Sequence, residues 1–447
     1  MVRYRVGDME LKSSYYNIFF HLKPYGPWIG YNGLSGNFVE INDMDFSILE
    51  KILKNPNIKG ISIKEKKVRS TLIKYGFLVS YNINEIESLK LKFQNPLNQC
   101  SAFFTIAITE ECNFNCTYCF EKHGVQYMND KVRTRVLSFI KKHIPKMKLL
   151  TIDWYGGEPL LRLDLLENLD TEIENACKEY QCEYSSSIST NGYLLNEKVI
   201  KRLIKTSVNS LRICLDGISE IHNNYRKLKG GAPTFNLIIN NLLHASDNFN
   251  IKIRINIDKF NFKYFKELLN YLQDIGLSDK ENVILGIKPI ISSRIRPYSK
   301  AFNIREFSKV EPILLQQIVS SGFNIEYQPE KKCSYCIVFL PNQFMIDWRG
   351  FLYKCTDTFL PEEAIGKLTD SDNIFLDDTQ QKMWTDYPPT YDKKCRKCIA
   401  LPMCMGGCNF KRFISKDNYC AAERYNIEEY VKLRYESVKN KNVIYKL

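Results

Sequence analysis

The sequence contains 15 cysteines among its 447 residues, and most of them fall into two clusters. The first places Cys112, Cys116 and Cys119 within eight residues. The second is longer and comprises Cys333, Cys336, Cys355, Cys395, Cys398, Cys404, Cys408 and Cys420. Thiolates bind soft metals and iron–sulfur clusters, and an odd number of cysteines argues against complete internal pairing. The cysteines therefore predict metal or redox chemistry rather than a disulfide framework.

The three-cysteine loop leaves two kinds of site open. A structural zinc site normally needs four nitrogen or sulfur ligands, and His123 could supply the fourth. A [4Fe–4S] cluster normally takes four cysteines, so a loop with only three would leave one iron open to a substrate or cofactor.

The residues around the first cluster alternate between strand-like and helix-like patterns. Six stretches rich in β-branched and apolar residues are expected to be strands, at residues 103–109, 150–154, 184–189, 210–215, 252–257 and 284–289. Helical spacing separates them, first as an apolar stripe at Val132, Val136, Phe139, Ile140 and Ile144. Further helices are expected at residues 163–179, 196–205, 233–247 and 262–275.

This alternation predicts an α/β fold with a parallel sheet, either an open doubly wound sheet or a barrel. In both architectures the chemistry belongs on loops at the carboxyl ends of the strands. The three-cysteine loop directly follows the first predicted strand, and Gly156-Gly157-Glu158-Pro159 directly follows the second. Both motifs are therefore expected at the same edge of one sheet.

The Cys-x3-Cys-x2-Cys loop, followed by Phe120 and combined with Gly156-Gly157-Glu158-Pro159, resembles the radical S-adenosylmethionine (radical SAM) enzymes. This resemblance implies a partial (β/α)6 barrel in which an open iron of a [4Fe–4S] cluster chelates the amino and carboxylate groups of SAM. It also implies that the Gly-Gly-Glu-Pro segment contacts the methionine amino group.

Later strands end in segments that also resemble this family. Thr190 and Asn191 end the third strand, where relatives have a SAM-proximal segment. Arg226 follows an Asp-Gly…His pattern after the fourth strand, and Arg254 lies on the fifth. Either guanidinium would suit the SAM carboxylate, because it binds carboxylates bidentately. A structural ion pair is the alternative for each arginine.

The second cluster resembles the SPASM extension of certain radical SAM enzymes, which holds two auxiliary [4Fe–4S] clusters. By position, the resemblance assigns Cys333, Cys336, Cys355 and Cys408 to auxiliary cluster I. It assigns Cys395, Cys398, Cys404 and Cys420 to auxiliary cluster II. A pair of zinc ribbons is the alternative. The remaining cysteines, Cys100, Cys177, Cys182 and Cys214, are expected to be packing residues.

The first 95 residues combine predicted strands at 15–21 and 77–80, hairpin turns within 31–41, and helices at 43–53 and 68–75. This arrangement resembles the winged-helix-like modules that bind the leader of ribosomally made peptides by adding it as a strand at a sheet edge. A structural cap on the barrel is the alternative. A DNA-binding helix is less favoured, because no predicted helix is rich in Arg and Lys.

These observations predict three regions: a leader-recognition domain at 1–95, a radical SAM barrel at 100–320 and a SPASM domain at 325–447. The expected function is a peptide maturase that uses three [4Fe–4S] clusters and SAM to install a crosslink. Asp357 and Asp347, both near Cys355, are candidates for a general base. The alternatives are an anaerobic sulfatase-maturing enzyme that forms formylglycine and, in another class, a non-catalytic zinc-binding adaptor.

The composition bounds the partners and the compartment. Lys and Arg outnumber Asp and Glu by 63 to 50, a net charge of +13, but the charges are dispersed and suit an acidic peptide as well as nucleic acid. We expect a precursor peptide and a reductant such as flavodoxin or ferredoxin as partners, with no nucleic acid and no membrane. Because no apolar run is long enough for a membrane helix and no signal peptide is evident, a cytoplasmic location is expected.

Overall fold

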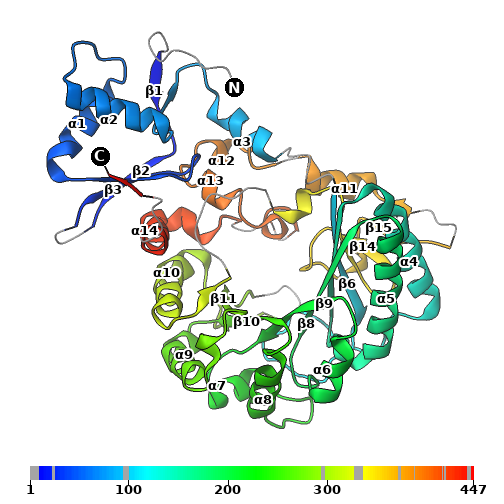
Figure 1. The fold of residues 1–447 in the computed structure, drawn as a ribbon. Coiled ribbons are helices and arrows are strands. Elements are labelled where there is room, and N and C mark those ends of the chain that lie inside the picture. Colours follow the sequence, from blue (N-terminus) through cyan, green and yellow to red (C-terminus); the bar gives the residue numbers. More distant parts are fainter. Residues whose placement is uncertain are drawn as a thin grey trace.

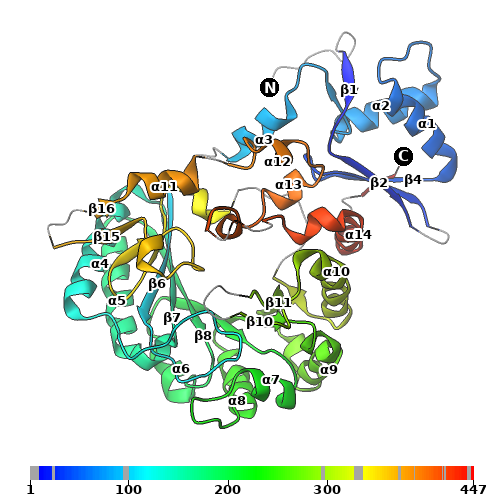
Figure 2. The ribbon, with the colours of Figure 1, turned by 180° about the vertical axis from the view of Figure 1, so that it is seen from behind.

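The computed structural model describes residues 10–22, 26–93, 100–292, 297–326, 336–370, 374–386, 388–414, 416, 419–439 and 444–446. A curved sheet with helices on its outer side forms the largest part (Figure 1). The C-terminal part of the chain, coloured orange and red, lies between this barrel and the blue N-terminal unit in both views (Figure 2).

Six parallel strands in chain order form the centre of the main sheet. They are β6 (Ser101–Thr109), β7 (Leu149–Gly156), β8 (Glu183–Thr190), β9 (Val208–Cys214), β10 (Asn250–Ile257) and β11 (Val283–Pro289). Each pairs in parallel with the next. All six predicted strands overlap these elements, so the predicted α/β fold with a partial barrel is confirmed.

Helices cover the outer side of the six strands (Figure 1). They are α4 (Asp130–His143), α5 (Leu163–Glu179), α6 (Glu197–Leu203), α7 (Ser219–Tyr225), α8 (Phe235–Ala245), α9 (Phe265–Asp274) and α10 (Ile304–Ser320). In α4 the side chain of Asn129 caps the first turn by accepting from the Val132 N–H. The predicted apolar stripe of this helix is buried, as expected for a helix packed on a sheet.

The C-terminal region shares its sheet with the barrel. β13 (Gln343–Ile346) pairs in parallel with β6, on the side opposite β7. β14 (Phe351–Tyr353), β15 (Gly366–Leu368) and β16 (Ile374–Leu376) extend this edge in antiparallel order, and β12 (Asn324–Ile325) extends the far edge beyond β11. The turn between β13 and β14 therefore lies at the carboxyl end of β6, beside the loop that carries the first cysteine cluster, and β14 then runs back toward the amino end of β6 before Cys355.

The N-terminal unit contains the antiparallel strands β2 (Asn17–His21), β3 (Trp28–Asn32) and β4 (Phe38–Ile41). Helices α1 (Asp43–Lys54) and α2 (Ile63–Lys74) follow, and β1 (Leu11–Ser13) pairs with β5 (Leu78–Ser80) before α3 (Glu85–Phe93). The chain returns to this unit at its end, where β17 (Ile444–Lys446) pairs in parallel with β4.

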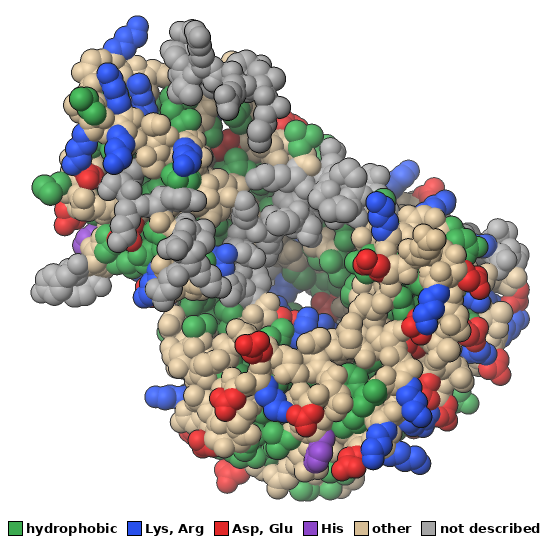
Figure 3. Space-filling view, in the orientation of Figure 1, with side chains coloured by type: hydrophobic (Ala, Val, Ile, Leu, Met, Phe, Trp, Pro, Cys, Tyr) green, Lys and Arg blue, Asp and Glu red, His purple; other side chains and the backbone are tan. Residues whose placement is uncertain are grey.

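Helix α2 begins five residues earlier than predicted. Ser62 and Glu65 form a capping box, in which each side chain accepts from the other residue's backbone N–H. The longer helix carries Lys64, Lys66, Lys67, Arg69 and Lys74. The statement that no helix here is rich in Arg and Lys was therefore wrong, and Figure 3 shows basic side chains gathered over α1 and α2.

The remaining helices are α11 (Asp378–Thr385), α12 (Lys393–Arg396), α13 (Leu401–Cys404) and α14 (Ile427–Val438). Over the part of the chain that the structure describes, no helix combines the length and the apolar character needed to cross a membrane.

Candidate active site

The three-cysteine loop follows β6 and is largely shielded from solvent. Cys112 and Cys116 are buried, and Cys119 is half-buried. Burial raises the pKa of all three thiols, that of Cys112 to about 12. Thiolates at this place therefore need a metal or a cationic partner. His123 Nε2 lies 3.2 Å from Cys119 Sγ, while its Nδ1 lies 3.1 Å from the Glu110 carbonyl oxygen.

The cysteine loop can be compared with the geometry that a single bound metal ion requires. No three or more His, Cys, Asp or Glu side chains among the described residues are placed to hold one metal ion. The sulfurs of the loop are thus not gathered around a point, as a tetrahedral zinc site would need.

The two glycines after β7 hold the second motif directly against the cysteine loop. Gly156 has φ +124°, and a Cβ on it would lie 2.2 Å from the Thr109 carbonyl oxygen. A Cβ on Gly157 would lie 2.3 Å from the Glu111 carbonyl oxygen. The Gly157 N–H donates to Thr109 O at 3.0 Å, and the Glu158 N–H donates to Glu111 O at 2.8 Å. Glycine is required here because backbone meets backbone.

Glu158 joins the second motif to the third. Its side chain is fully buried, and its Oε1 accepts from the Leu160 N–H at 3.0 Å and the Thr190 hydroxyl at 2.8 Å. Its Oε2 accepts from the Asn191 N–H at 2.7 Å. Burial raises the pKa of Glu158, although these hydrogen bonds oppose the rise. In this structure the carboxylate positions the segment at Thr190 and Asn191, and its oxygens are engaged by the protein itself.

Asn191 continues the chain of contacts back to the cysteine loop. Its side-chain Nδ2 donates to Asn113 Oδ1 at 2.7 Å, and its Oδ1 accepts from the Tyr193 N–H at 3.0 Å. The loops after β6, β7 and β8 are therefore cross-linked by hydrogen bonds at one edge of the sheet, as the sequence predicted for the two first motifs.

A buried polar network surrounds Tyr118, which lies between the second and third cysteines of the loop. The Tyr118 hydroxyl donates to Asp216 Oδ2. The Tyr118 hydroxyl oxygen in turn accepts from Arg226 Nη1 at 2.8 Å and from Asn256 Nδ2 at 3.0 Å. The four residues come from the cysteine loop and from the ends of β9, α7 and β10, so the network ties the loop to the far half of the barrel.

We expect Tyr118→Phe to weaken this anchoring. The change removes the acceptor of Arg226 Nη1 in a buried site, which costs about 1–3 kcal/mol, while Asn256 Nδ2 keeps its bond to Asp216 Oδ1. The midpoint of thermal unfolding should fall, whereas Tyr193→Phe, on the neighbouring loop, should leave it nearly unchanged. Equal midpoints for the two variants would show that the network does not stabilise the barrel.

Arg226 is the guanidinium that lies beside the cysteine loop. Its side chain is 8% exposed, and its Nε is buried without a hydrogen-bond partner among the described residues. Burial raises the pKa of Cys116, and the Arg226 charge offsets part of that rise. Three thiols with a buried, incompletely satisfied guanidinium next to them suit an anionic iron–sulfur cluster and a carboxylate ligand.

Arg254, the second candidate arginine, lies on β10. Its Nε donates to Asn256 Oδ1 at 3.1 Å. Burial raises the pKa of Asp357, and the charges of Arg254 and Lys411 oppose this rise. Asp357 therefore lies close to Arg254 on β10.

Asp347 occupies a different environment. It is fully buried in the turn between β13 and β14, and Oδ2 accepts from Arg349 Nε at 2.8 Å and from Arg349 Nη2 at 2.6 Å. Its Oδ1 accepts from the backbone N–H groups of Arg349 and Phe351. This carboxylate holds the hairpin, and Asp357 is the one of the two predicted general bases that lies close to Arg254.

The auxiliary cysteines fall into two groups in space. Burial, and then the charges of Asp357, Cys336 and Cys408, raise the pKa of Cys355. Cys336, Cys355 and Cys408 therefore lie near one another, the assignment of these cysteines to cluster I stays a prediction, and Cys333 lies outside the described residues. Burial, Asp392, Cys404 and Cys420 raise the pKa of Cys395 to about 12.

Cys398, the fourth cysteine assigned to cluster II, shares the neighbour Arg424 with Cys420. The Arg424 Nη1 donates to Cys420 Sγ at 3.1 Å. Burial lowers the pKa of Arg424, but the charges of Cys420 and Cys398 outweigh this effect. The four cysteines assigned to cluster II therefore share one neighbourhood with a cation.

An aromatic wall that sequence reasoning missed joins the two cysteine regions. The ring of Phe359 lies 6.0 Å from that of Phe120 and stacks at 6.2 Å on Tyr155. Burial raises the pKa of Glu121 to about 7, although a hydrogen bond with Tyr155 opposes the rise. The sequence signal for this wall was that its residues are adjacent to the two motifs. Phe120 and Glu121 follow Cys119, and Tyr155 precedes Gly156.

Cys214 also differs from its expected packing role. It is half-buried at the end of β9, and its charge contributes to raising the pKa of Cys116, after burial as the main cause. It therefore lies close to the first cysteine loop.

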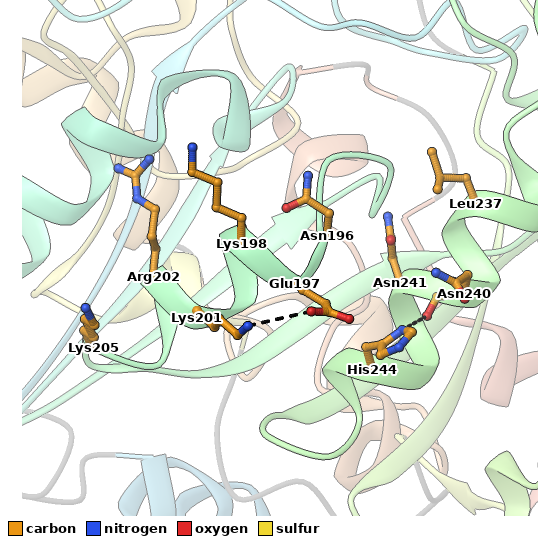
Figure 4. Close-up of a pocket in the computed structure, with 10 residues that line it drawn as sticks. All are labelled: Asn196, Glu197, Lys198, Lys201, Arg202, Lys205, Leu237, Asn240, Asn241 and His244. Atoms are coloured by element: carbon orange, nitrogen blue, oxygen red, sulfur yellow. Dashed lines mark hydrogen bonds and ion pairs between the residues drawn. The ribbon is translucent and has the colours of Figure 1, made fainter.

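A hollow of about 750 Å³ lies outside the barrel, between α6 and α8 (Figure 4). Its lining is polar and basic, with Lys198, Lys201, Arg202 and Lys205 on α6 and its end. Arg202 Nε donates to Glu167 at 2.8 Å, so this cation is engaged. No cysteine lines the hollow, so it is separate from the cysteine loops described above.

Residues 106–288 match the family model described as Radical SAM superfamily. The cysteine-type anaerobic sulfatase-maturating enzyme of Clostridium novyi (strain NT) is 26% identical over 379 residues, covering 73% of this chain and 94% of that protein. A solved structure of anSMEcpe with bound AdoMet and Cp18Cys peptide has a TM-score of 0.59 at 18% identity. That match covers 76% of this chain and 98% of the other.

The structure of Streptococcus suis SuiB bound to precursor peptide SuiA matches with a TM-score of 0.50 at 15% identity. It covers 94% of this chain and 99% of the other. At such identities these likenesses concern the fold. The family match identifies residues 106–288 as a radical SAM domain, and the two solved structures show that the chain shares their fold.

Proposed function

We propose that this protein is a peptide maturase that installs a crosslink in a ribosomally made precursor peptide. A [4Fe–4S] cluster and SAM are the cofactors that the radical SAM family implies. When bound, they would supply a 5′-deoxyadenosyl radical that abstracts hydrogen from an unactivated carbon of the peptide. The observation that carries the proposal is the arrangement of the loops after β6, β7 and β8 around Cys112, Cys116 and Cys119.

The chain's own residues have distinct tasks in this proposal. Cys112, Cys116 and Cys119 would hold the cluster, and Arg226, with its free Nε, would bind the SAM carboxylate or offset the cluster charge. Glu158 would act by positioning the segment at Thr190. The aromatic wall of Phe120, Tyr155 and Phe359 would exclude water, which protects a reactive radical from side reactions.

Asp357 would accept a proton from a thiol, amide or hydroxyl of the peptide when a crosslink forms. It lies close to Arg254, so a substrate near Arg254 would be within reach of it. Cys355 and Cys408, both assigned to auxiliary cluster I, lie near Asp357. Clusters held by the auxiliary cysteines would take up the electron that the substrate radical must lose on closing a ring. A flavodoxin or ferredoxin would supply the initial electron.

The N-terminal unit supports a leader-guided peptide substrate. The anSMEcpe match spans 98% of that protein but only 76% of this chain. The SuiB match spans nearly the full length of both chains, and that structure holds a precursor peptide. A strand-rich unit appended to a maturase barrel is suited to peptide capture by strand addition.

A sulfatase-maturing activity is the second candidate, supported by the 94% coverage of the Clostridium novyi enzyme. Its substrate would be a Cys or Ser in a protein, oxidised to formylglycine. Product mass separates a crosslink from formylglycine made from Cys, because that reaction exchanges sulfur for oxygen. Formylglycine made from Ser loses two hydrogens, as a crosslink does, and is recognised instead by the hydrazone that its aldehyde forms. Co-expression with a short peptide encoded beside this chain, followed by mass spectrometry, should show a loss of about two daltons per crosslink, because each new bond removes two hydrogens.

Deletion of residues 1–95 should separate substrate capture from SAM chemistry. We expect the shortened protein to cleave SAM without peptide, because the loops at the strand ends lie outside the deleted segment. Peptide affinity should fall at least tenfold, measured by fluorescence anisotropy with a labelled precursor peptide. Unchanged peptide affinity in a variant that still produces 5′-deoxyadenosine would refute leader binding by this unit.

A further inference from the structure

The antiparallel sheet of the N-terminal unit has one edge filled by the chain's own C-terminus. Strand β17 (Ile444–Lys446) pairs in parallel with β4, with Ile444 opposite Phe38 and Lys446 opposite Glu40. Figure 1 shows this red strand beside the blue sheet. The exposed edge of a sheet presents unpaired N–H and C=O groups that can pair with another extended chain. β4 is thus an edge that accepts an added strand.

Side chains of β4 alternate between two apolar layers. Phe38 faces α14, because its ring lies 5.9 Å from that of Tyr435 on this helix. The same ring lies 4.7 Å from that of Tyr31 on β3. Val39 and Ile41 are fully buried in a second core together with residues of α1 and α2. Residues directly opposite each other in a ladder point to the same face, so Ile444 joins the layer of Phe38. A segment paired with β4 therefore lies between α14 and α1–α2.

The pairing is short, and it is tethered. Its three residues are at the lower limit of strand length in proteins, so few ladder bonds have to break when another segment takes the same edge. Helix α14 is docked on the sheet, since the Tyr435 hydroxyl donates to Glu40 Oε2 at 3.2 Å. The helix ends at Val438, only six residues before Ile444, which keeps β17 near β4 at a local concentration on the order of millimolar.

We propose that the β4 edge is the docking strand for an extended segment of the substrate's leader, and that residues 444–446 occupy this edge until the peptide displaces them. The identity of the displacing segment as a leader rests on the proposed function; the strand-accepting edge does not. The segment suited to the edge carries an apolar residue opposite Phe38, the place that Ile444 holds.

A labelled synthetic peptide with the sequence of residues 439–447 probes the edge directly. In the full-length chain the tethered strand competes with it. The variant Ile444→Pro/Tyr445→Pro should release the edge, because N–H groups alternate sides along a strand and two consecutive prolines remove a ladder donor in either phase. We expect this variant to bind the peptide at least tenfold more tightly than the unchanged chain. The matched control Ile444→Val/Tyr445→Phe should bind like the unchanged chain.

A chain ending at Lys439 provides a second variant that contains no new proline. It too should bind the probe at least tenfold more tightly, and peptide addition should restore slow hydrogen exchange at residues 38–41. A probe with aspartate at the position of Ile444 should not bind. Equal affinity of the unchanged and both altered chains, or protection elsewhere than β4, would overturn the proposal.

The precursor peptide then separates this inference from the proposed function. If the unchanged chain modifies the precursor but neither variant binds it more tightly, the β4 edge is not the leader site and the maturase activity stands. If both variants bind the probe at β4 but no precursor is bound or modified, the edge accepts strands while the peptide-maturase function fails, and with it the leader as occupant.

Discussion

Combined replacement of the three loop cysteines, Cys112→Ala, Cys116→Ala and Cys119→Ala, is expected to abolish reductive cleavage of SAM. The three thiols are the only ligands proposed for the SAM-binding cluster, so cleavage should fall at least a thousandfold, to the background of the assay. Chromatography of 5′-deoxyadenosine after reduction with dithionite measures the effect. Iron content should fall by about four per chain, because the auxiliary cysteines are untouched.

Cys177→Ala is a matched control for this experiment, since Cys177 is also a buried cysteine but lies on α5, outside both cysteine groups. It should retain its iron and its SAM cleavage. Undiminished 5′-deoxyadenosine formation by the triple variant would mean that the reactive cluster is held elsewhere in the chain.

Glu158→Ala is expected to have the largest effect of any single change on the barrel's reaction loops. The carboxylate accepts hydrogen bonds from Leu160, Thr190 and Asn191 in a fully buried site. Removing it leaves these donors unsatisfied and opens a cavity, at a cost of about 2–4 kcal/mol in the free energy of unfolding. Denaturant unfolding measures that loss, and SAM binding should weaken because the segment at Thr190 is released.

Two further substitutions set the scale for this prediction. Glu158→Gln keeps one acceptor oxygen and should lie between the unchanged chain and Glu158→Ala. Glu174→Ala removes an exposed ion pair with Lys178 and should cost no more than about 0.5 kcal/mol. If Glu158→Ala were as stable as Glu174→Ala and bound SAM normally, the positioning role of Glu158 would be refuted.

Local pattern was sufficient for the central fold. The six strands were predicted because each is a short β-branched run followed by a helical stripe, and this signal depends on neighbouring residues alone. The order of the motifs after successive strands then predicted that Cys112 and Gly156 share one edge, since parallel strands end on the same side.

Contacts between distant segments could not be predicted in this way. The pairing of β13 with β6 joins residues more than 200 positions apart, and no periodicity in either strand names its partner. The network around Tyr118 draws on four separate elements for the same reason. The early start of α2 was different, because its capping signal, Ser62 followed three residues later by Glu65, is visible in the sequence and was overlooked.

Among the cysteines, those with a characteristic spacing could be assigned from the sequence, whereas an isolated cysteine could not. The interlaced assignment came from a resemblance in spacing, and the structure brings Cys408 near Cys336 and Cys355 although they lie far apart in the chain. Cys214 was predicted to be a packing residue, because a lone cysteine in a strand carries no spacing signal. Its proximity to Cys116 depends on how β9 packs beside the loop after β6.

Iron, acid-labile sulfide and zinc, measured on anaerobically purified and reconstituted protein, test the account most directly. Three cubane clusters predict about twelve irons and twelve sulfides per chain, with little zinc. The triple cysteine variant should then hold about eight of each. Stoichiometric zinc without sulfide in the unchanged chain would contradict the radical SAM account and favour a zinc-binding protein.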